Sequence, residues 1–186
     1  KETNALIDGH FILSSGLHSP QYVQCAQLLS KPFKSANFCK SFAEKISKEF
    51  KEIDLILSPA MGGVVIGYEI GRLLKKETIF SERVEGQFKL RRDFQIAKKS
   101  KVLIVEDVIT TGKSSIECSK LVEIAGAEVL GFACLIDRSN RNSLINKKIV
   151  SQVEINIPTY SENNLPNNLI SLTPIKPGSR ELKWER

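Results

Sequence analysis

Residues 102–114 read Val-Leu-Ile-Val-Glu-Asp-Val-Ile-Thr-Thr-Gly-Lys-Ser, and this stretch decides the fold that we predict. Its four leading apolar residues indicate a buried strand, and two carboxylates follow where that strand ends. The next turn is rich in Thr, Gly and Ser and opens a helix over 113–125, which Gly126 ends. Because ligands of open α/β sheets bind at the carboxyl ends of strands, we expect the site here.

The two parts of this stretch suit two parts of one ligand. The turn presents free backbone N–H groups at the positive end of a helix, which suits a phosphate. Glu106 and Asp107 would be costly to bury alone, and the vicinal hydroxyls of a sugar would donate to them. A phosphorylated ribose is therefore predicted. The spacing is not that of a Walker loop. The plain alternative is a strand that ends in a solvated acidic turn.

Strands and helices alternate on both sides of this stretch. We predict strands over 54–58, 77–82, 101–106 and 128–136, and helices over 35–50, 64–76 and 113–125. The alternation predicts an α/β fold with a central, mostly parallel sheet flanked by helices. The charged residues 83–100 are expected to form a mobile excursion, and the last part of the chain, rich in Pro and Asn, an irregular flap.

The composition excludes several classes of protein. The chain has 186 residues, 41% of them hydrophobic and 26% charged, which is typical of one globular domain. The net charge of +6 permits an anionic ligand without requiring nucleic acid. We expect no membrane span and no signal peptide. The four cysteines lie far apart in the sequence, which favours reduced thiols in the cytoplasm and, with His10 and His18 distant from them, disfavours a zinc site.

Residues 102–112 match, without a gap, the signature of the type I phosphoribosyltransferases: four apolar residues, two acids, two apolar residues, two small residues and Gly. The chain thus resembles a family that transfers phosphoribose from 5-phosphoribosyl 1-diphosphate (PRPP) to a nitrogen, usually with Mg²⁺. The resemblance implies the type I phosphoribosyltransferase fold as a single domain over 1–186. Its core would lie at about 35–150, its small hood or flap would come from 1–34 and 151–186, and a lid loop would be mobile.

The same resemblance assigns the donor site. It implies that Glu106 and Asp107 hold the ribose hydroxyls and that the loop after them cradles the 5′-phosphate. The residues implied in PRPP binding are Glu106, Asp107, Val108, Ile109, Thr110, Thr111, Gly112, Lys113 and Ser114. It further implies that Ala60, Met61 and Gly62 bind the diphosphate, and that Mg²⁺ is held through the diphosphate and ribose rather than by protein side chains.

The acceptor is indicated by a second motif. Residues 9–24, Gly-His-Phe-Ile-Leu-Ser-Ser-Gly-Leu-His-Ser-Pro-Gln-Tyr-Val-Gln, resemble the N-terminal motif of orotate phosphoribosyltransferases, and Asp137-Arg138 matches them too. The resemblance implies that Thr110, Arg138, Tyr22 and Val23 bind orotate. The chemistry agrees, because Arg is the side chain best shaped to grip a carboxylate with two hydrogen bonds. The plain alternatives are a surface ion pair for Arg138 and a core position for Tyr22.

The chain departs from one branch of these enzymes. That branch has Lys where this chain has Ser14, and Tyr-Lys where it has Met61-Gly62, and its lysines are tied to the diphosphate and orotate. A second branch carries Ser and Met-Gly at these places, and the chain resembles that branch. Which cations bind the diphosphate here therefore stays open.

A basic segment over 83–92 is the candidate lid. We expect Arg83, Lys89 and Arg91 to stabilise the leaving diphosphate, while closure excludes water. In the family such a loop often reaches the partner subunit's site, which implies a homodimer. A solvated basic hairpin is the plain alternative.

Two rival functions share the donor loop. A purine-salvage phosphoribosyltransferase would lack the N-terminal motif. A PRPP-sensing regulator would add a basic face or a DNA-binding domain, whereas the basic residues here are scattered and no segment is spare. We expect orotate and PRPP as small-molecule partners, and neither nucleic acid nor a membrane.

Overall fold

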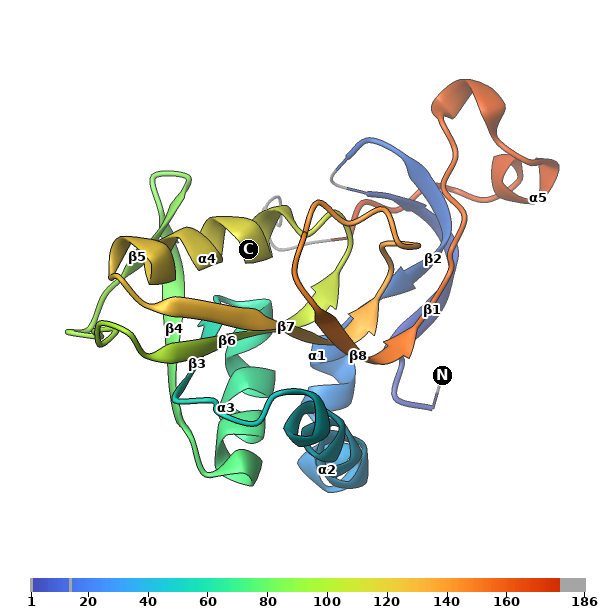
Figure 1. Ribbon diagram of the computed structural model, residues 1–186. Helices are drawn as coiled ribbons and strands as arrows, with labels where there is room; N and C mark the ends of the chain where they lie inside the picture. The colour runs from blue at the N-terminus through green and yellow to red at the C-terminus, as the bar shows by residue number, and fades with distance from the viewer. Residues whose placement is uncertain (1, 14, 178–186) are drawn as a thin grey trace, which may run out of the picture. The chain divides into compact units, whose positions relative to one another are not determined.

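The computed structural model describes residues 2–13 and 15–177 of the chain (Figure 1). Ser14, at which the chain departs from one branch, lies outside the described residues, as does the stretch from Gly178 on. The chain divides into two compact units, each described by itself: Leu28–Asn156, and the residues up to Gln27 together with those from Ile157 on. The single domain expected from the sequence stays a prediction.

The larger unit contains a six-stranded sheet in the order β5-β4-β3-β6-β7-β8. Its strands are β3 (Leu55–Pro59), β4 (Glu77–Val84), β5 (Gln87–Leu90), β6 (Lys101–Ile109), β7 (Glu128–Asp137) and β8 (Ile149–Glu154). All neighbouring strands pair in parallel except β5, which runs antiparallel to β4. The prediction of a mostly parallel sheet is confirmed.

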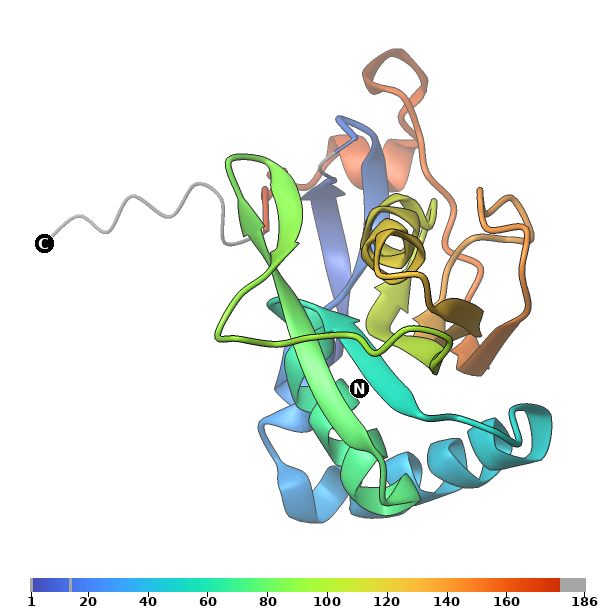
Figure 2. The same ribbon diagram turned by 60° about the vertical axis from the view of Figure 1, so that its left-hand side comes forward.

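Three helices cover this sheet: α2 (Pro32–Glu49), α3 (Gly62–Leu74) and α4 (Lys113–Ile124). Figures 1 and 2 show α4 on one face of the sheet and α2 with α3 on the other. Helix α2 begins with Pro32 at its first turn, where the missing N–H costs nothing, and buries Phe42 and Ile46 one turn apart. The sheet is therefore covered on both faces, as its apolar strands require.

The topology places a ligand site between β3 and β6. These strands are neighbours, but the chain leaves β3 towards β4 and leaves β6 towards β7 on the opposite side. Because such crossovers are right-handed, α3 and α4 lie on opposite faces and the sheet changes direction between β3 and β6. The carboxyl ends of the two strands flank the crevice in which open α/β sheets bind ligands.

The core of this unit packs tightly between the sheet and α4. Leu57, Ile104, Cys118, Val122 and Cys134 are fully buried in it. Both cysteines of this cluster, like Cys25 and Cys39, are buried and take part in no disulfide. The prediction that they serve as small apolar side chains is confirmed.

Two segments differ from what the sequence predicted. Strand β4 runs to Val84 and turns at Glu85 and Gly86 into β5, so 83–90, expected to begin a mobile excursion, form a β-hairpin. Residues 151–154, expected in the flap, complete β8 at the edge of the sheet. Both are edge strands with half-exposed side chains, so their sequences lack a strong apolar pattern.

The smaller unit is built on an antiparallel pair, β1 (Leu6–Ile12) and β2 (His18–Val23). Isolated β-bridges join Phe11 to Ile175 and His18 to Tyr160, so the segment around these C-terminal residues lies beside the β1–β2 hairpin. The remaining elements are α1 (Cys25–Leu29), η1 (Glu162–Asn164) and α5 (Asn167–Ile170). Within the ranges that the structure describes, no helix has the length and apolar character to cross a membrane.

Candidate functional site

Glu106 and Asp107 lie near the carboxyl end of β6, beside the crevice between β3 and β6. Burial raises the pKa of Glu106 to about 7, a hydrogen bond from Ser115 lowers it, and the neighbouring Asp107 raises it. Burial also raises the pKa of Asp107, against the hydrogen bond from the Val108 N–H to its Oδ1 at 2.9 Å. A buried acid pair of this kind is typical of a site that receives hydroxyl donors or a cation.

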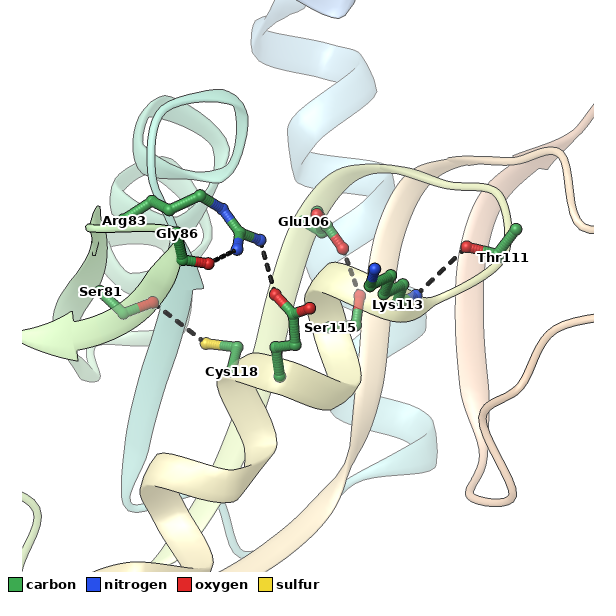
Figure 3. Close-up of polar contacts among 9 residues, drawn as sticks. Ser81, Arg83, Gly86, Glu106, Thr111, Lys113, Ser115 and Cys118 are labelled. Carbon is green, nitrogen blue, oxygen red and sulfur yellow. Dashed lines mark hydrogen bonds and ion pairs between the residues drawn. The ribbon is translucent and has the colours of Figure 1, made fainter. Parts of the chain in front are cut away.

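Helix α4 supplies a donor to this pair. Figure 3 shows the Ser115 hydroxyl donating to Glu106 Oε2 from the first turn of α4. One turn further along, the Cys118 thiol lies 3.3 Å from the Ser81 hydroxyl of β4 (Figure 3). Burial raises the pKa of Cys118 to about 12, so this thiol is neutral at physiological pH.

The turn after β3 packs directly against the acid pair. A Cβ added at Gly62 would stand 2.5 Å from Asp107 Oδ1, so the turn approaches the carboxylate as closely as backbone allows. The Ala60–Met61 peptide in this turn is cis, and the Ala60 N–H donates to Ser81 O at 2.8 Å. The structure thus brings the predicted diphosphate residues Ala60–Gly62 next to the predicted ribose acids.

The predicted phosphate loop follows β6 and opens α4. Thr110 and Thr111 are exposed, and Gly112 adopts a φ of 78°, which favours glycine. The N-cap of α4 is this glycine, which has no side chain to cap the helix, and the Lys113 N–H makes only a long hydrogen bond of 3.4 Å to Thr111 Oγ1 (Figure 3). The loop therefore has the free donors and positive helix end that suit a phosphate.

A second loop, residues 139–145, packs on the phosphate loop. The Leu144 N–H donates to Thr111 O at 2.9 Å, and a Cβ on Gly112 would stand 2.7 Å from Ile145 Cγ1. A side chain at Gly112 would force Ile145 and Ser143 to shift and would be strained by the positive φ of this residue. The packing of the two loops was not predicted, because nothing in residues 139–145 taken alone indicates the contact.

Arg138 lies at the same edge of the sheet. Its N–H donates to Ile109 O at 2.8 Å, which places its backbone beside Thr110. The preceding Asp137 accepts from the Ser139 N–H at 2.7 Å and turns the chain after β7. The structure thus brings Arg138 and Thr110 together at the end of β6.

The predicted lid cations lie on or next to the β4–β5 hairpin. Arg83 pairs with Glu117 of α4 at 2.6 Å and donates to Gly86 O (Figure 3). Its guanidinium also lies 4.2 Å above the centre of the Phe88 ring. Lys89 lies 3.7 Å from Glu85, and Arg91 lies 3.6 Å from Glu82. Each cation has an acidic neighbour here, and the exposed pair of Lys89 with Glu85 contributes little to stability.

Tyr22 and Val23 belong to the smaller unit. Tyr22 is half-buried, with its ring 5.6 Å from that of Phe11, and Val23 is buried. They pair with Ile7 and Leu6 across the β1–β2 hairpin. Within this unit Tyr22 packs as a partly buried aromatic residue.

Sequence reasoning missed Ser115 and Glu117, both just past the recognised motif. The signal was present in the buried face of α4, where Ser115, Cys118, Ser119 and Val122 follow one another at helical spacing. That spacing turns Ser115 towards the strand that bears the acids. Glu117, in contrast, is identified by its distance to Arg83 and by no local pattern.

The acid pair alone offers few ligands to a metal ion. In the part of the chain that the structure describes, no group of three or more His, Cys, Asp or Glu side chains could hold a metal ion. Mg²⁺ commonly binds through one or two carboxylates plus substrate phosphates, so the donor set fits an ion held largely by substrate.

Comparisons with known proteins agree with this geometry. A model of the phosphoribosyl transferase domain matches residues 31–166. The orotate phosphoribosyltransferase of Parvibaculum lavamentivorans is 45% identical over 183 residues, which are 98% of this chain and 94% of that one.

Two solved structures share the fold. The orotate phosphoribosyltransferase from Aeropyrum pernix matches with a TM-score of 0.72 and 21% identity, over 83% of this chain and 90% of that one. The adenine phosphoribosyltransferase from Thermoanaerobacter pseudethanolicus matches with a TM-score of 0.62 and 20% identity, over 73% and 88%. Since acceptors differ between these two proteins, the fold alone does not choose the acceptor.

Proposed function

This chain belongs to the orotate phosphoribosyltransferases of the phosphoribosyl transferase family, and from that premise we propose which of its residues bind each part of the substrates. The enzyme transfers the phosphoribosyl group of PRPP to orotate, which gives orotidine 5′-phosphate and diphosphate in pyrimidine synthesis. The observation that carries the residue assignment is the contact of the Gly62 turn with Asp107, beside the glycine-capped start of α4.

The donor lies along the crevice between β3 and β6. The loop Thr110–Ser114 binds the 5′-phosphate with backbone N–H groups, and Glu106 and Asp107 accept from the ribose hydroxyls. Ala60–Gly62, packed against Asp107, bind the diphosphate. These contacts fix C1 of the ribose, where the bond to the diphosphate breaks through an oxocarbenium-like state and the acceptor nitrogen bonds.

Mg²⁺ fits this arrangement as a cofactor held through the diphosphate and ribose oxygens that these residues position. The chemistry it supplies when bound is neutralisation of the charge that grows on the leaving diphosphate. The enzyme's own contribution is to orient both substrates and to exclude water.

Orotate is bound by Arg138 and Thr110, which the structure holds side by side at the end of β6. Arg138 matches the orotate carboxylate with two parallel hydrogen bonds. Because orotate is already an anion with a reactive nitrogen, the reaction needs neither a covalent nucleophile nor a strong general base.

Arg83, Lys89 and Arg91 act from the β4–β5 hairpin on the departing diphosphate. Support comes from their pairing with Glu117, Glu85 and Glu82, which a diphosphate of higher charge would displace. We place the enzyme in the cytoplasm, where its four buried thiols would stay reduced.

The active form is a homodimer in this proposal. Val65 and Tyr68 on α3 expose 53% and 68% of their surface, and apolar side chains on one helix face favour contact with a second copy. Sedimentation should find twice the 20.8 kDa of one chain, and Tyr68→Glu should shift the mass towards one. A fully active species of 20.8 kDa would contradict the dimer.

One assay tests the function together with its donor site. Loss of orotate absorbance is followed after PRPP and Mg²⁺ are added, with adenine, hypoxanthine and uracil as alternative acceptors. Asp107→Asn should lower catalytic efficiency by about ten- to a hundredfold, the worth of one charge-assisted hydrogen bond. Wild-type rates in both Asp107→Asn and Glu106→Gln would show that the ribose binds elsewhere.

A further inference from the structure

Ser115 donates its hydroxyl proton to the acid pair rather than to its own helix. It is fully buried in the first turn of α4, and its Oγ donates to Glu106 Oε2 (Figure 3). The next buried serine of this helix, Ser119, donates to Ile116 O at 2.9 Å, as serines within helices commonly do. Helix formation alone therefore does not account for the Ser115 contact.

We propose that Ser115 is a positioning residue for the donor: it holds Glu106 Oε2 so that Oε1 is aimed at a hydroxyl of the ribose. The inference rests on the proposed role of Glu106 in PRPP binding. A glutamate side chain has three rotatable bonds, and its terminal torsion is broad. A buried hydroxyl on a helix that packs against the sheet restricts that torsion, which preorganises the acceptor oxygen.

The groups around Glu106 make its protonation state depend on the hydrogen bond from Ser115. Burial and the adjacent Asp107 both favour the protonated acid, whereas the Ser115 hydrogen bond favours the carboxylate. Two cysteines are also neighbours of Glu106. Cys118 on α4 feels the charge of Glu106, and Cys134 on β7 is paired with Glu106 in the β6–β7 register. Cys118 is neutral because burial raises its pKa to about 12, and a thiol would not replace the hydroxyl as a donor.

The test compares Ser115→Ala with Ser119→Ala, a buried serine of the same helix that does not touch the acids. Calorimetric titration with PRPP should show a Kd about tenfold higher in Ser115→Ala and within about twofold of wild type in Ser119→Ala. The KM for orotate at saturating PRPP should stay within about twofold in both variants. Ser115→Thr, which keeps the hydroxyl, should recover most of the PRPP affinity.

Two further measurements separate positioning from folding. Ribose 5-phosphate and its 2-deoxy and 3-deoxy analogues, used as competitive inhibitors, should be discriminated less well by Ser115→Ala, because the lost contact acts on a hydroxyl. In a Glu106→Ala background, Ser115→Ala should change the PRPP Kd by less than about twofold, since no carboxylate remains to be positioned. If Ser115→Ala does not fold, Ser115→Cys replaces it and is expected to show the same weakening of PRPP binding.

The outcomes distinguish this inference from the proposed function. A wild-type enzyme that does not consume orotate with PRPP would overturn the function itself. An active wild type whose Ser115→Ala and Ser119→Ala variants bind PRPP equally well would overturn the positioning role alone. Equal losses for PRPP and orotate in Ser115→Ala would also overturn it, because they indicate a general defect.

Discussion

Gly62 lies against Asp107 so closely that an added Cβ would stand 2.5 Å from Oδ1 and 2.8 Å from Cγ of the carboxylate. The two residues come from different elements: Gly62 is the first residue of α3, and Asp107 lies near the carboxyl end of β6. Their contact joins the turn assigned to the diphosphate with the acid assigned to the ribose. The position of Asp107 therefore depends on the absence of a side chain at Gly62.

Gly62→Ala should impair donor binding more than folding. The atoms it would meet are the far end of a side chain, so Asp107 would rotate away while the backbone stays in place. We expect catalytic efficiency for PRPP to fall about ten- to a hundredfold with a nearly unchanged thermal midpoint. Gly63→Ala is the matched control, because its Cβ would meet the Val105 carbonyl at 3.0 Å. That backbone contact should lower the thermal midpoint instead.

Activity should depend on pH through Glu106. Its pKa is raised to about 7, chiefly by burial, so the carboxyl gains a proton as the pH falls through neutrality. A protonated acid is a poorer acceptor for a ribose hydroxyl, and kcat/KM for PRPP should fall between about pH 8 and about pH 6. Glu106→Gln, which does not titrate, should lower the plateau and flatten this limb. An identical limb in Glu106→Gln would assign it to another group.

The protonation of Glu106 should affect stability in the opposite direction: the protein should lose stability, not activity, as the pH rises. The folded state binds this proton more tightly than the unfolded chain, because the pKa is about 7 instead of the ordinary 4.5. The contribution of Glu106 to stability is therefore fully present below 4.5 and is lost as pH rises to about 7. Glu106→Gln should raise the unfolding free energy more at about pH 8 than at about pH 5. Urea titrations at both pH values measure the difference.

A buried histidine pair in the smaller unit supports a separate prediction. His10 Nε2 lies 2.6 Å from His18 Nδ1, and His10 Nδ1 lies 3.0 Å from the Leu172 carbonyl oxygen, which can only accept. His18→Ala would leave a buried ring nitrogen without its partner and should destabilise the protein by about 1–3 kcal/mol. Gln21→Ala, which removes an exposed hydrogen bond to Asp8 at 2.7 Å, should cost less than about 0.5 kcal/mol. Equal losses would show that the pair adds nothing.

Local signals explain what the sequence could predict. The strand, acids, turn and helix of residues 102–114 follow one another without interruption, so their order alone predicts a phosphoribose site at a sheet edge. The buried, apolar strands β3, β6 and β7 were predicted for the same reason. Each such strand has its pattern within a few residues, and no distant contact is needed to recognise it.

The missed features depend on distant contacts. The close approach of Gly62 to Asp107 joins the start of α3 to β6, and the Arg83–Glu117 pair joins β4 to α4. Strands β5 and β8 lie at the two edges of the sheet, where pairing with one neighbour stabilises sequences that are half polar. Such features come from tertiary structure, which a single sequence expresses only weakly.

Arg138 provides the test of acceptor choice. Its backbone is held beside Thr110 by the hydrogen bond from its N–H to Ile109 O at 2.8 Å. Arg138→Ala would remove the bidentate partner of the orotate carboxylate, at a cost of about 2–5 kcal/mol if the pair is shielded from water. Arg138→Lys should recover part of the loss, because an ammonium lacks the planar fork. In steady-state kinetics the efficiency for orotate should collapse, while the PRPP dissociation constant stays within a few-fold, because the 5′-phosphate is bound by the loop. Equal weakening of both substrates would indicate a folding defect, and an unchanged orotate efficiency would move the carboxylate site away from Arg138.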